Sequence, residues 1–504
     1  MTQVSGARTS VSDLSSLAVT DMPPVLTPAY RLVIRLEIDN RPGMFAEVAR
    51  TIGQRGGSLG AIDLVEATPT KHVRDVTVDV PDEATGEQLA ADLRAVGGVV
   101  VRSISDRTFL MHLGGKVAMT GRVAVRNRDD LSLVYTPGVA RVSMAIANDP
   151  ERSWALTQRA NAVAIISDGT AVLGLGNVGP LAALPVMEGK SLLFADLAGI
   201  SAFPIVIQPG TVEQTVETVA RLSVGFGGIN LEDIAAPACF EIERKLRERL
   251  EIPVFHDDQH GTAIVVLAGL RNAAAVCGVA IDDLRVVVLG AGAAGLATTR
   301  LLHVAGAKHV MAVDHHGTVT TQRGDLNPEK RAVAEEVGAT GPSQSLAHAL
   351  KDANVLIGLS GPRLVTVEMV RTMAKPRIVF AMANPDPEVD PIAAAPLVDV
   401  MATGRSDFPN QVNNVLAFPG VFRGLLDARA STVTTNMELA AAAALADSVP
   451  AALRSAEYIL PSVFDAQVVP AIAKAVSAAA RADGVARRTD RDAAPGPAGR
   501  SIAG

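Results

Sequence analysis

A glycine-rich turn between an apolar strand and a helix constrains this fold more than any other segment. In R-V-V-V-L-G-A-G-A-A-G, residues 285–295, an apolar run leads directly into Gly290, Gly292 and Gly295. Gly290 permits a tight turn, and Gly292 lets a pyrophosphate approach the backbone at the helix N-terminus. Gly295 lets the helix pack closely on the strand. The segment predicts an α/β fold whose sheet is doubly wound in the Rossmann manner.

The strand after this turn ends in a carboxylate, as the second strand of a dinucleotide-binding fold does. The strand H-V-M-A-V-D ends in Asp314, which is placed to accept a hydrogen bond from an adenosine ribose hydroxyl. Strand, turn, helix and acid together predict binding of NAD or NADP. Asp314 favours NAD, because its charge would repel the phosphate that NADP carries on that ribose. His315 and His316 follow, and at neutral pH they offer donors but little fixed positive charge.

Two pairs of acids precede the glycine turn. Glu232 and Asp233 follow the apolar run G-G-I-N-L, and Asp257 and Asp258 follow I-P-V-F-H. The runs predict two strands separated by a helix, A-C-F-E-I-E-R-K-L-R-E-R-L, and parallel neighbours would bring both pairs to one edge. Taken singly, each acid could cap a helix. Taken together, an all-oxygen set of converging carboxylates predicts a Mg²⁺ or Mn²⁺ site.

Composition is typical of a soluble globular protein without a nucleic-acid partner. The length of 504 residues predicts roughly three domains, and the net charge of −7 supplies no basic surface for nucleic acid or an anionic membrane. No 18 uncharged apolar residues run together, and the N-terminus lacks the order of a signal peptide, so we expect a cytoplasmic protein without a membrane span. Cys239 and Cys277 fit that compartment as small core residues.

Changes of pattern divide the chain into parts. The first ordered part follows the order strand, helix, strand, strand, helix, strand, which is a ferredoxin-like βαββαβ unit. Two stretches of alternating strands and helices come next, and Ala-rich helices follow them. The expected parts are a disordered tail 1–28, the βαββαβ unit 29–108, a substrate and metal domain 109–270, a Rossmann-like domain 271–436, C-terminal helices 437–482 and a disordered tail 483–504.

The turn after the first strand of the βαββαβ unit resembles ACT domains. The segment D-N-R-P-G-M-F-A-E-V places Asp39 and Asn40 before Gly43. The resemblance implies that Gly43 lets the backbone approach a bound amino acid or a partner domain. Sensing of a small-molecule effector and packing of chains into dimers both remain open, because a fold alone does not fix function.

Further motifs between residues 114 and 487 occur in a recognisable order. L-S-L-V-Y-T-P-G-V-A holds Tyr135, P-V-M-E-G-K holds Lys190, and N-Q-V-N-N-V-L-A-F-P-G lies late in the chain. Together with the acids and the glycine turn, they resemble malic enzymes of the prokaryotic type. The resemblance implies oxidative decarboxylation of malate to pyruvate and CO₂, with NAD(P) and with Mg²⁺ or Mn²⁺.

The same resemblance implies roles for single residues. A lysine base requires a lowered pKa, which burial beside a divalent cation would achieve, and Asp257 would orient Lys190 or share its proton. Tyr135 would protonate the enol carbon. The implied set is Glu232, Asp233 and Asp258 as metal ligands, Lys190 as base, Tyr135 as acid, and Asn384 and Asn414 facing substrate and nicotinamide.

One departure and two alternatives accompany the resemblance. The family often has Lys after L-L-F, where this chain has Ala195, a change of local charge outside the core roles. A malolactic-type enzyme would use the same residues but retain the cofactor and release lactate. A catalytically inactive ligand-sensing or assembly protein is the other alternative, and the intact Tyr135 and Lys190 argue against it. We expect a homodimer or a larger homo-oligomer.

Overall fold

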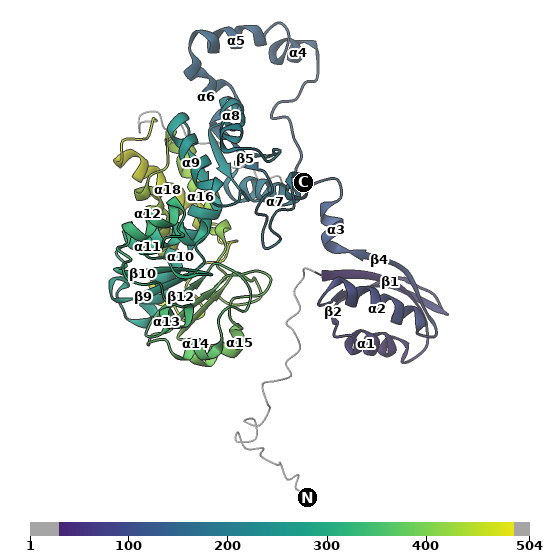
Figure 1. The fold of residues 1–504 in the computed structure, drawn as a ribbon. Coiled ribbons are helices and arrows are strands. Elements are labelled where there is room, and N and C mark those ends of the chain that lie inside the picture. The colour runs from purple at the N-terminus through teal and green to yellow at the C-terminus, as the bar shows by residue number, and fades with distance from the viewer. Residues whose placement is uncertain (1–29, 488–504) are drawn as a thin grey trace, which may run out of the picture. The chain divides into compact units, whose positions relative to one another are not determined.

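The computed structural model describes residues 30–487, and the chain divides into two compact units between Gly115 and Lys116. Each unit has its own sheet or sheets (Figure 1). The predicted tail 1–28 and most of the predicted tail 483–504 lie outside the described residues.

The N-terminal unit contains a four-stranded antiparallel sheet in the order β2-β3-β1-β4. Along β1, Ile34 and Leu36 are fully buried, whereas Arg35 points to the opposite face and pairs with Asp75 at 2.7 Å. The predicted βαββαβ order is confirmed. The elements are β1 (Arg31–Asp39), α1 (Met44–Gln54), β2 (Ser58–Ala67), β3 (Lys71–Asp79), α2 (Glu83–Ala95), β4 (Val99–Asp106) and a short α3 (Arg107–His112).

The second unit begins with a parallel four-stranded sheet in the order β6-β5-β7-β8. Strands β5, β7 and β8 are buried along their whole length, as strands covered on both faces are. The two strands predicted to carry the acid pairs are β7 and β8, and they are parallel neighbours. The elements are β5 (Ala162–Ser167), α7 (Pro180–Ala198), β6 (Ser201–Val206), α8 (Val212–Leu222), β7 (Gly228–Leu231), α9 (Ala238–Arg249) and β8 (Val254–His256).

A second parallel sheet in the order β10-β9-β12-β13-β14 confirms the Rossmann-like prediction, and β11 (Gly317–Thr318) pairs antiparallel at its edge. The chain reverses its strand order at β9, so the turn after β9 lies at the switch point where such sheets bind ligands. The elements are β9 (Arg285–Leu289), α11 (Ala293–Val304), β10 (His309–Asp314), α12 (Pro328–Glu336), α13 (Leu346–Leu350), β12 (Val355–Gly358), α14 (Val367–Arg371), β13 (Ile378–Ala381), α15 (Pro391–Ala394) and β14 (Val400–Thr403).

Helix α10 (Asp257–Cys277) joins the two parallel sheets. It begins at the second acid pair and runs through one core that includes Val163 of β5 and Val288 of β9. The expected boundary at residue 270 therefore falls inside a continuous helix. By length and composition alone α10 is long and apolar enough to cross a membrane, but 67% of its most apolar window is buried inside the protein. It is the core helix of a folded unit.

Three C-terminal helices close the core, namely α16 (Phe418–Ala428), α17 (Thr435–Asp447) and α18 (Val468–Ala482). The predicted Ala-rich helices are confirmed at α17 and α18. The start of the predicted disordered tail needs correction, because residues 483–487 fold back on the chain. The carbonyl of Val485 accepts the Ser431 N–H at 3.0 Å, and the Val485 side chain packs against the core.

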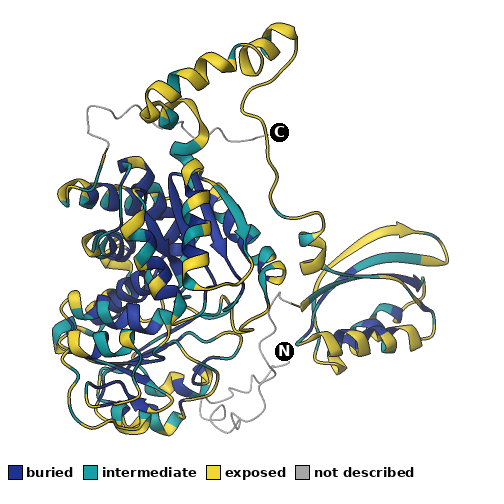
Figure 2. Ribbon diagram, turned by 45° about the horizontal axis from the view of Figure 1, so that its top comes forward, coloured by how far each residue is buried: buried dark blue, intermediate teal, exposed yellow. Residues whose placement is uncertain are grey.

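Residues 116–150 form a segment that we call the arm. It contains α4 (Arg128–Val134) and α5 (Val139–Asn148), and none of its residues is buried (Figure 2). After the arm, the short helix α6 (Ser153–Leu156) returns the chain to β5.

Candidate active site

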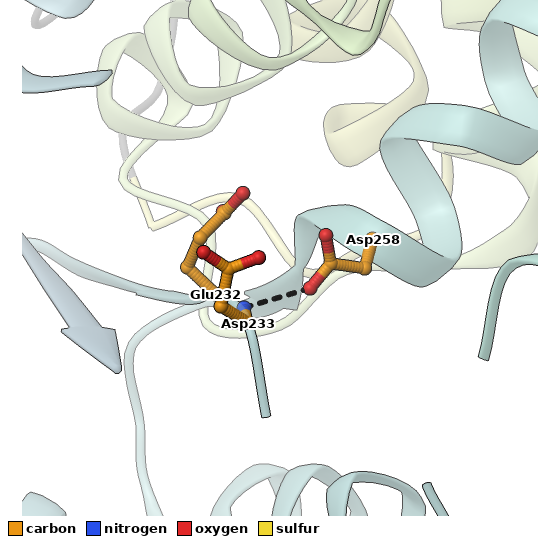
Figure 3. Close-up of side chains that lie close together, drawn as sticks. All are labelled: Glu232, Asp233 and Asp258. Carbon is orange, nitrogen blue, oxygen red and sulfur yellow. Dashed lines mark hydrogen bonds between the residues drawn. The ribbon is translucent and has the colours of Figure 1, made fainter. Parts of the chain in front are cut away.

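Three carboxylates meet where β7 and β8 end (Figure 3). Oxygens of Glu232, Asp233 and Asp258 all lie within 4.8 Å of one another, and the backbone N–H of Asp233 donates to Asp258 Oδ2 at 2.8 Å. Asp233 has a φ of 54°, in the left-handed region that residues other than glycine rarely adopt. The two acid pairs are therefore brought together at one edge, as the parallel strands predicted.

The carboxylate cluster has the character of a hard-cation site. Oδ2 of Asp233 is buried and finds no hydrogen-bond partner among the described residues. Burial and the neighbouring charge of Asp258 raise the pKa of Asp233 to about 7. A divalent cation would supply the missing partner and offset the mutual repulsion, and an all-oxygen donor set suits Mg²⁺ or Mn²⁺.

Lys190, on α7, is buried against these acids. Its Nζ lies 2.5 Å from Glu232 Oε2, also contacts Asp257 Oδ2, and stands 4.5 Å from the centre of the Phe418 ring. Burial lowers the pKa of Lys190, but the charges of Asp257 and Glu232 outweigh burial and raise that pKa above its ordinary value. The protein groups alone thus do not give the lowered pKa expected from the sequence. A cation among the acids would offset their charge.

A second layer of polar side chains holds the acids in place. Asn230 Nδ2 donates to Glu232 Oε2 at 2.9 Å, and His256 Nε2 lies 3.1 Å from Asp258 Oδ2. Our reading of the sequence missed both residues. Asn230 stands two positions before Glu232, a spacing at which side chains leave a strand on the same face, so this signal was present.

A buried histidine links three helices beside the site. His260 Nε2 lies 3.0 Å from Glu243 of α9, and its Nδ1 lies 2.9 Å from Glu438 of α17. Burial lowers the pKa of His260, but the charges of Glu243 and Glu438 outweigh burial and raise it to about 9. The sequence offered no signal for this contact, since it joins residues far apart in the chain.

The two predicted asparagines lie at different places around the cluster. A Cβ added to Gly261 would stand 1.9 Å from Asp257 Oδ1 and 3.4 Å from Asn414 Cβ, so Asn414 lies beside the acids. Asn384 follows β13, and its carbonyl oxygen lies 2.7 Å from an added Cβ at Gly174. The structure therefore places Asn414 at the second acid pair and Asn384 against the loop that follows β5.

Tyr135 does not join the cluster within this chain. It follows α4 in the arm and is 67% exposed. Of the three predicted catalytic residues, Lys190 and Asp257 lie in the cluster and Tyr135 does not.

The glycine turn has the geometry that its sequence predicted. Gly290 has a φ of 120°, and an added Cβ would lie 2.3 Å from the Leu359 carbonyl oxygen. An added Cβ at Gly295 would lie 1.8 Å from the Gly290 oxygen, so helix and turn require glycine there. Gly292 faces open space at the start of α11, where helix N–H groups would meet an anion.

Asp314, the predicted ribose acceptor at the end of β10, already has two cationic partners. Arg323 Nη1 donates to it at 2.7 Å and Lys330 Nζ at 2.6 Å. Burial raises the pKa of Asp314, but these donors outweigh burial and hold it at about 2. The rings of His315 and His316 lie 3.8 Å apart directly after it. Arg323 also pairs with Asp325 at 2.5 Å, so a charge-balanced cluster of two acids and two cations replaces the lone carboxylate expected from the sequence.

Two family models match the chain. Residues 115–247 match the N-terminal domain of malic enzyme, and residues 259–481 match the NAD binding domain of malic enzyme. The first match contains the arm, Lys190 and the first acid pair, and the second contains the glycine turn.

Curated relatives carry the same name. The chain is 48% identical over 460 residues to an NAD-dependent malic enzyme of Geobacillus stearothermophilus, an alignment that covers 91% of this chain and 96% of that protein. It is 50% identical over 377 residues to a bifunctional malic/malolactic enzyme of Bacillus subtilis, which covers 74% of this chain and 92% of that protein. The first alignment is long enough to reach into the N-terminal unit.

Solved structures agree in fold. The malic enzyme of Pyrococcus horikoshii matches with a TM-score of 0.71 and 44% identity, covering 74% of this chain and 89% of that chain. An NAD-dependent malic enzyme of Thermotoga maritima matches with a TM-score of 0.71 and 44% identity, covering 74% of this chain and 99% of that chain.

Proposed function

The chain belongs to the malic enzyme family, and from that premise we propose that it oxidises and decarboxylates malate to pyruvate and CO₂ while reducing NAD(P). The observation that carries the proposal is the contact of buried Lys190 with Glu232 and Asp257, beside a carboxylate cluster suited to a divalent cation. NAD is the favoured cofactor, as in the name of the Geobacillus relative.

The position of each residue in the site suggests its role in the reaction. A cation held by Glu232, Asp233 and Asp258 would polarise substrate oxygens, and the nicotinamide would accept the hydride from carbon 2 of malate. Lys190 takes the proton of the malate hydroxyl. Asp257 contacts Lys190 Nζ and positions it.

The remaining assigned residues handle the product side and the substrate. Tyr135 returns a proton to the carbon that lost CO₂, which gives the methyl group of pyruvate. Asn414, close to Asp257, contacts the substrate, and Asn384 faces the substrate and the nicotinamide ring. The glycines of the turn after β9 receive the pyrophosphate.

A product assay tests this function. With malate, NAD and Mn²⁺, pyruvate, CO₂ and NADH should form in equal amounts, and NADP should replace NAD less effectively. The malolactic alternative stays testable in the same assay, because the Bacillus relative is named for both activities. Lactate formed without net release of NADH would select it, and the absence of any product would overturn the enzymatic assignment.

We further infer that the N-terminal unit is an ACT-like regulatory module. Its βαββαβ order and the left-handed Gly43, with a φ of 89°, support this reading. Asn40 Nδ2 donates to the Pro69 carbonyl at 3.2 Å and so holds the turn before Gly43. A cavity of about 400 Å³ lies elsewhere in the module, between α2 and Tyr30, and offers a second place for an effector.

Two coarser proposals complete the account. We propose that the boundary near residue 270 separates two functions within one folded core. The acids lie on its N-terminal side and the dinucleotide-binding turn lies on its C-terminal side. The free thiols of Cys239 and Cys277 support a reducing, cytoplasmic location.

A further inference from the structure

Asp233 has a backbone conformation that its surroundings must enforce. Its φ of 54° lies in the left-handed region, where a residue with a Cβ is strained. Such a conformation persists only where neighbouring groups over-determine it, and it occurs mostly at functional sites. On one side the Asp233 N–H donates to Asp258 Oδ2 at 2.8 Å (Figure 3). The carbonyl on the other side is held from outside the carboxylate cluster.

The loop between β5 and α7, residues 168–179, supplies this second hold. The Ala171 N–H of the loop donates to the Asp233 carbonyl at 3.0 Å. Directly before it, Thr170 Oγ1 accepts the Ala235 N–H at 2.9 Å. Two consecutive loop residues therefore bind the chain at the strained residue and again two positions beyond it.

Asp168 fixes the direction of the Thr170 hydroxyl. Thr170 Oγ1 donates to Asp168 Oδ1 at 2.6 Å, and the Thr170 N–H donates to the same oxygen at 3.1 Å. The Asp168 side chain is buried at the end of β5. A hydroxyl has one proton and two lone pairs, so once its proton is directed to Asp168, the oxygen is left to accept the Ala235 N–H.

The loop is closed at its base, which makes it a fixed frame for these bonds. The N–H groups of Val178 and Gly179 donate to the Gly169 carbonyl at 3.2 Å and 3.1 Å. Gly169 has a φ of 70°, and an added Cβ would lie 2.3 Å from the Gly179 oxygen, so this closure requires glycine. The position of Thr170 is therefore set by the loop and not by the carboxylate cluster.

We propose that Thr170 is a positioning residue for the cation site. Its hydroxyl, directed by Asp168, holds the backbone of Asp233 in the conformation that places this carboxylate among the other acids. Thr170 acts through Asp233 and so sets the affinity for the cation. The effect on malate turnover rests on the proposed function, whereas the effect on cation affinity rests on the carboxylate cluster alone.

Calorimetric titration of the full chain with Mn²⁺ tests the positioning role. Thr170→Val keeps the branched shape but loses both hydrogen bonds of the hydroxyl, and it should bind Mn²⁺ about 10–100-fold more weakly, as is typical for a lost partner of a metal ligand. Thr170→Ser keeps the hydroxyl and should recover most of the affinity. Wild-type affinity in Thr170→Val would overturn the proposal, and so would an equal loss in Thr170→Ser.

A matched control and a kinetic measurement separate positioning from a general loss of structure. Thr366→Val removes a hydroxyl that accepts the Met369 N–H at 3.2 Å at the start of α14, and it should leave Mn²⁺ affinity unchanged. In malate oxidation, Thr170→Val should raise the KM for Mn²⁺ and keep kcat at saturating Mn²⁺ close to that of the wild type. A lowered kcat with an unchanged KM for Mn²⁺, or an equal loss of affinity in Thr366→Val, would contradict the positioning role.

Two further variants test the order of the contacts and the site itself. Asp168→Ala should also weaken Mn²⁺ binding, and its combination with Thr170→Val should bind no more weakly than Thr170→Val alone, because the two residues act in series. Losses that multiply in the double variant would overturn that order.

Asp258→Asn in the same titration distinguishes two failures. If Asp258→Asn binds Mn²⁺ like the wild type, the cluster is not the cation site, and the proposed function falls together with the role of Thr170. If Asp258→Asn loses affinity and Thr170→Val does not, the proposed function stands and the positioning role is overturned.

Discussion

Arg323 donates a 2.7 Å hydrogen bond to Asp314, at the position where a dinucleotide fold meets the adenosine ribose. Lys330 donates to the same carboxylate at 2.6 Å. The acid that would repel the 2′-phosphate of NADP is therefore flanked by two cations that would attract it. We therefore expect cofactor preference to depend on the balance of this cluster and not on Asp314 alone.

We predict that Asp314→Asn raises kcat/KM for NADP relative to NAD by about tenfold, a difference of about 1.4 kcal/mol. The change removes the repulsive charge and frees Lys330 for the phosphate, while Arg323 keeps its pair with Asp325. Lys330→Ala should shift the ratio in the opposite direction. Steady-state kinetics with both cofactors measures the ratio of kcat/KM for NADP to that for NAD. Lys308→Ala, which breaks an exposed pair with Asp282, is the matched control. A ratio unaffected by both Asp314→Asn and Lys330→Ala would place the discrimination elsewhere.

His260 should make the stability of the folded chain depend on pH. Its folded pKa of about 9 is above the ordinary 6.5, so the stabilisation is fully present below pH 6.5 and is lost as pH rises through 9. The shift corresponds to roughly 3 kcal/mol. Urea unfolding of wild type and His260→Asn between pH 6 and 10 should show a difference in unfolding free energy that shrinks with rising pH. A difference in unfolding free energy that stays constant with pH would mean that the ion pairs of His260 do not contribute to stability.

Lys190 and Tyr135 should separate the two proton transfers. Lys190→Ala should abolish NADH formation from malate, whereas Tyr135→Phe should mainly slow the exchange of pyruvate methyl protons with D₂O, because each residue handles a different proton. Absorbance and NMR measure the two reactions. The exposed Lys474→Ala is the control for Lys190. Equal and negligible effects of both substitutions would remove both residues from the chemistry.

Local pattern was enough to predict the elements that carry the acids and the glycine turn. The apolar runs before Glu232 and Asp257 form short strands that are parallel and buried. The spacing of the glycines predicted the turn at Gly290, where an added Cβ would clash with the backbone. The βαββαβ unit was predictable because its alternating strands follow period two, as Ile34 and Leu36 show.

Contacts between distant segments could not be predicted in this way. Arg323 and Lys330 reach Asp314 only because the chain after β11 folds back, and no local pattern encodes that return. The link between His260 and Glu438 joins two helices distant in sequence. The motif around Tyr135 identified a residue type without its position, because no residue of α4 or α5 is buried against the part of the chain that the structure describes.

Regulation by the N-terminal module gives a fourth prediction. A small polar effector, such as an amino acid, should bind near Asp39, Asn40 and Gly43 and change the malate KM several-fold, since coupling between sites is typically ~1–3 kcal/mol. Malate titrations of the full chain with each amino acid measure it. Gly43→Val should remove the response, because a β-branched residue resists a φ of 89°. An identical response from a chain that starts near Gly114 would exclude the module.

The central claim is that one buried cation site serves both oxidation and decarboxylation. Asp258→Asn removes one of its three carboxylates and leaves Asp233 and Glu232 in place. Glu248→Gln, an exposed acid that pairs with Arg244 on α9, is the control.

The most direct measurement is oxaloacetate decarboxylation by Asp258→Asn at ordinary Mn²⁺ concentration, with Mn²⁺ binding followed by calorimetry. We predict that Mn²⁺ affinity, malate oxidation and oxaloacetate decarboxylation fall together by at least a hundredfold, because the same ion polarises the oxygen in both reactions. Wild-type decarboxylation by Asp258→Asn, with Mn²⁺ bound as tightly as in the wild type, would contradict the account.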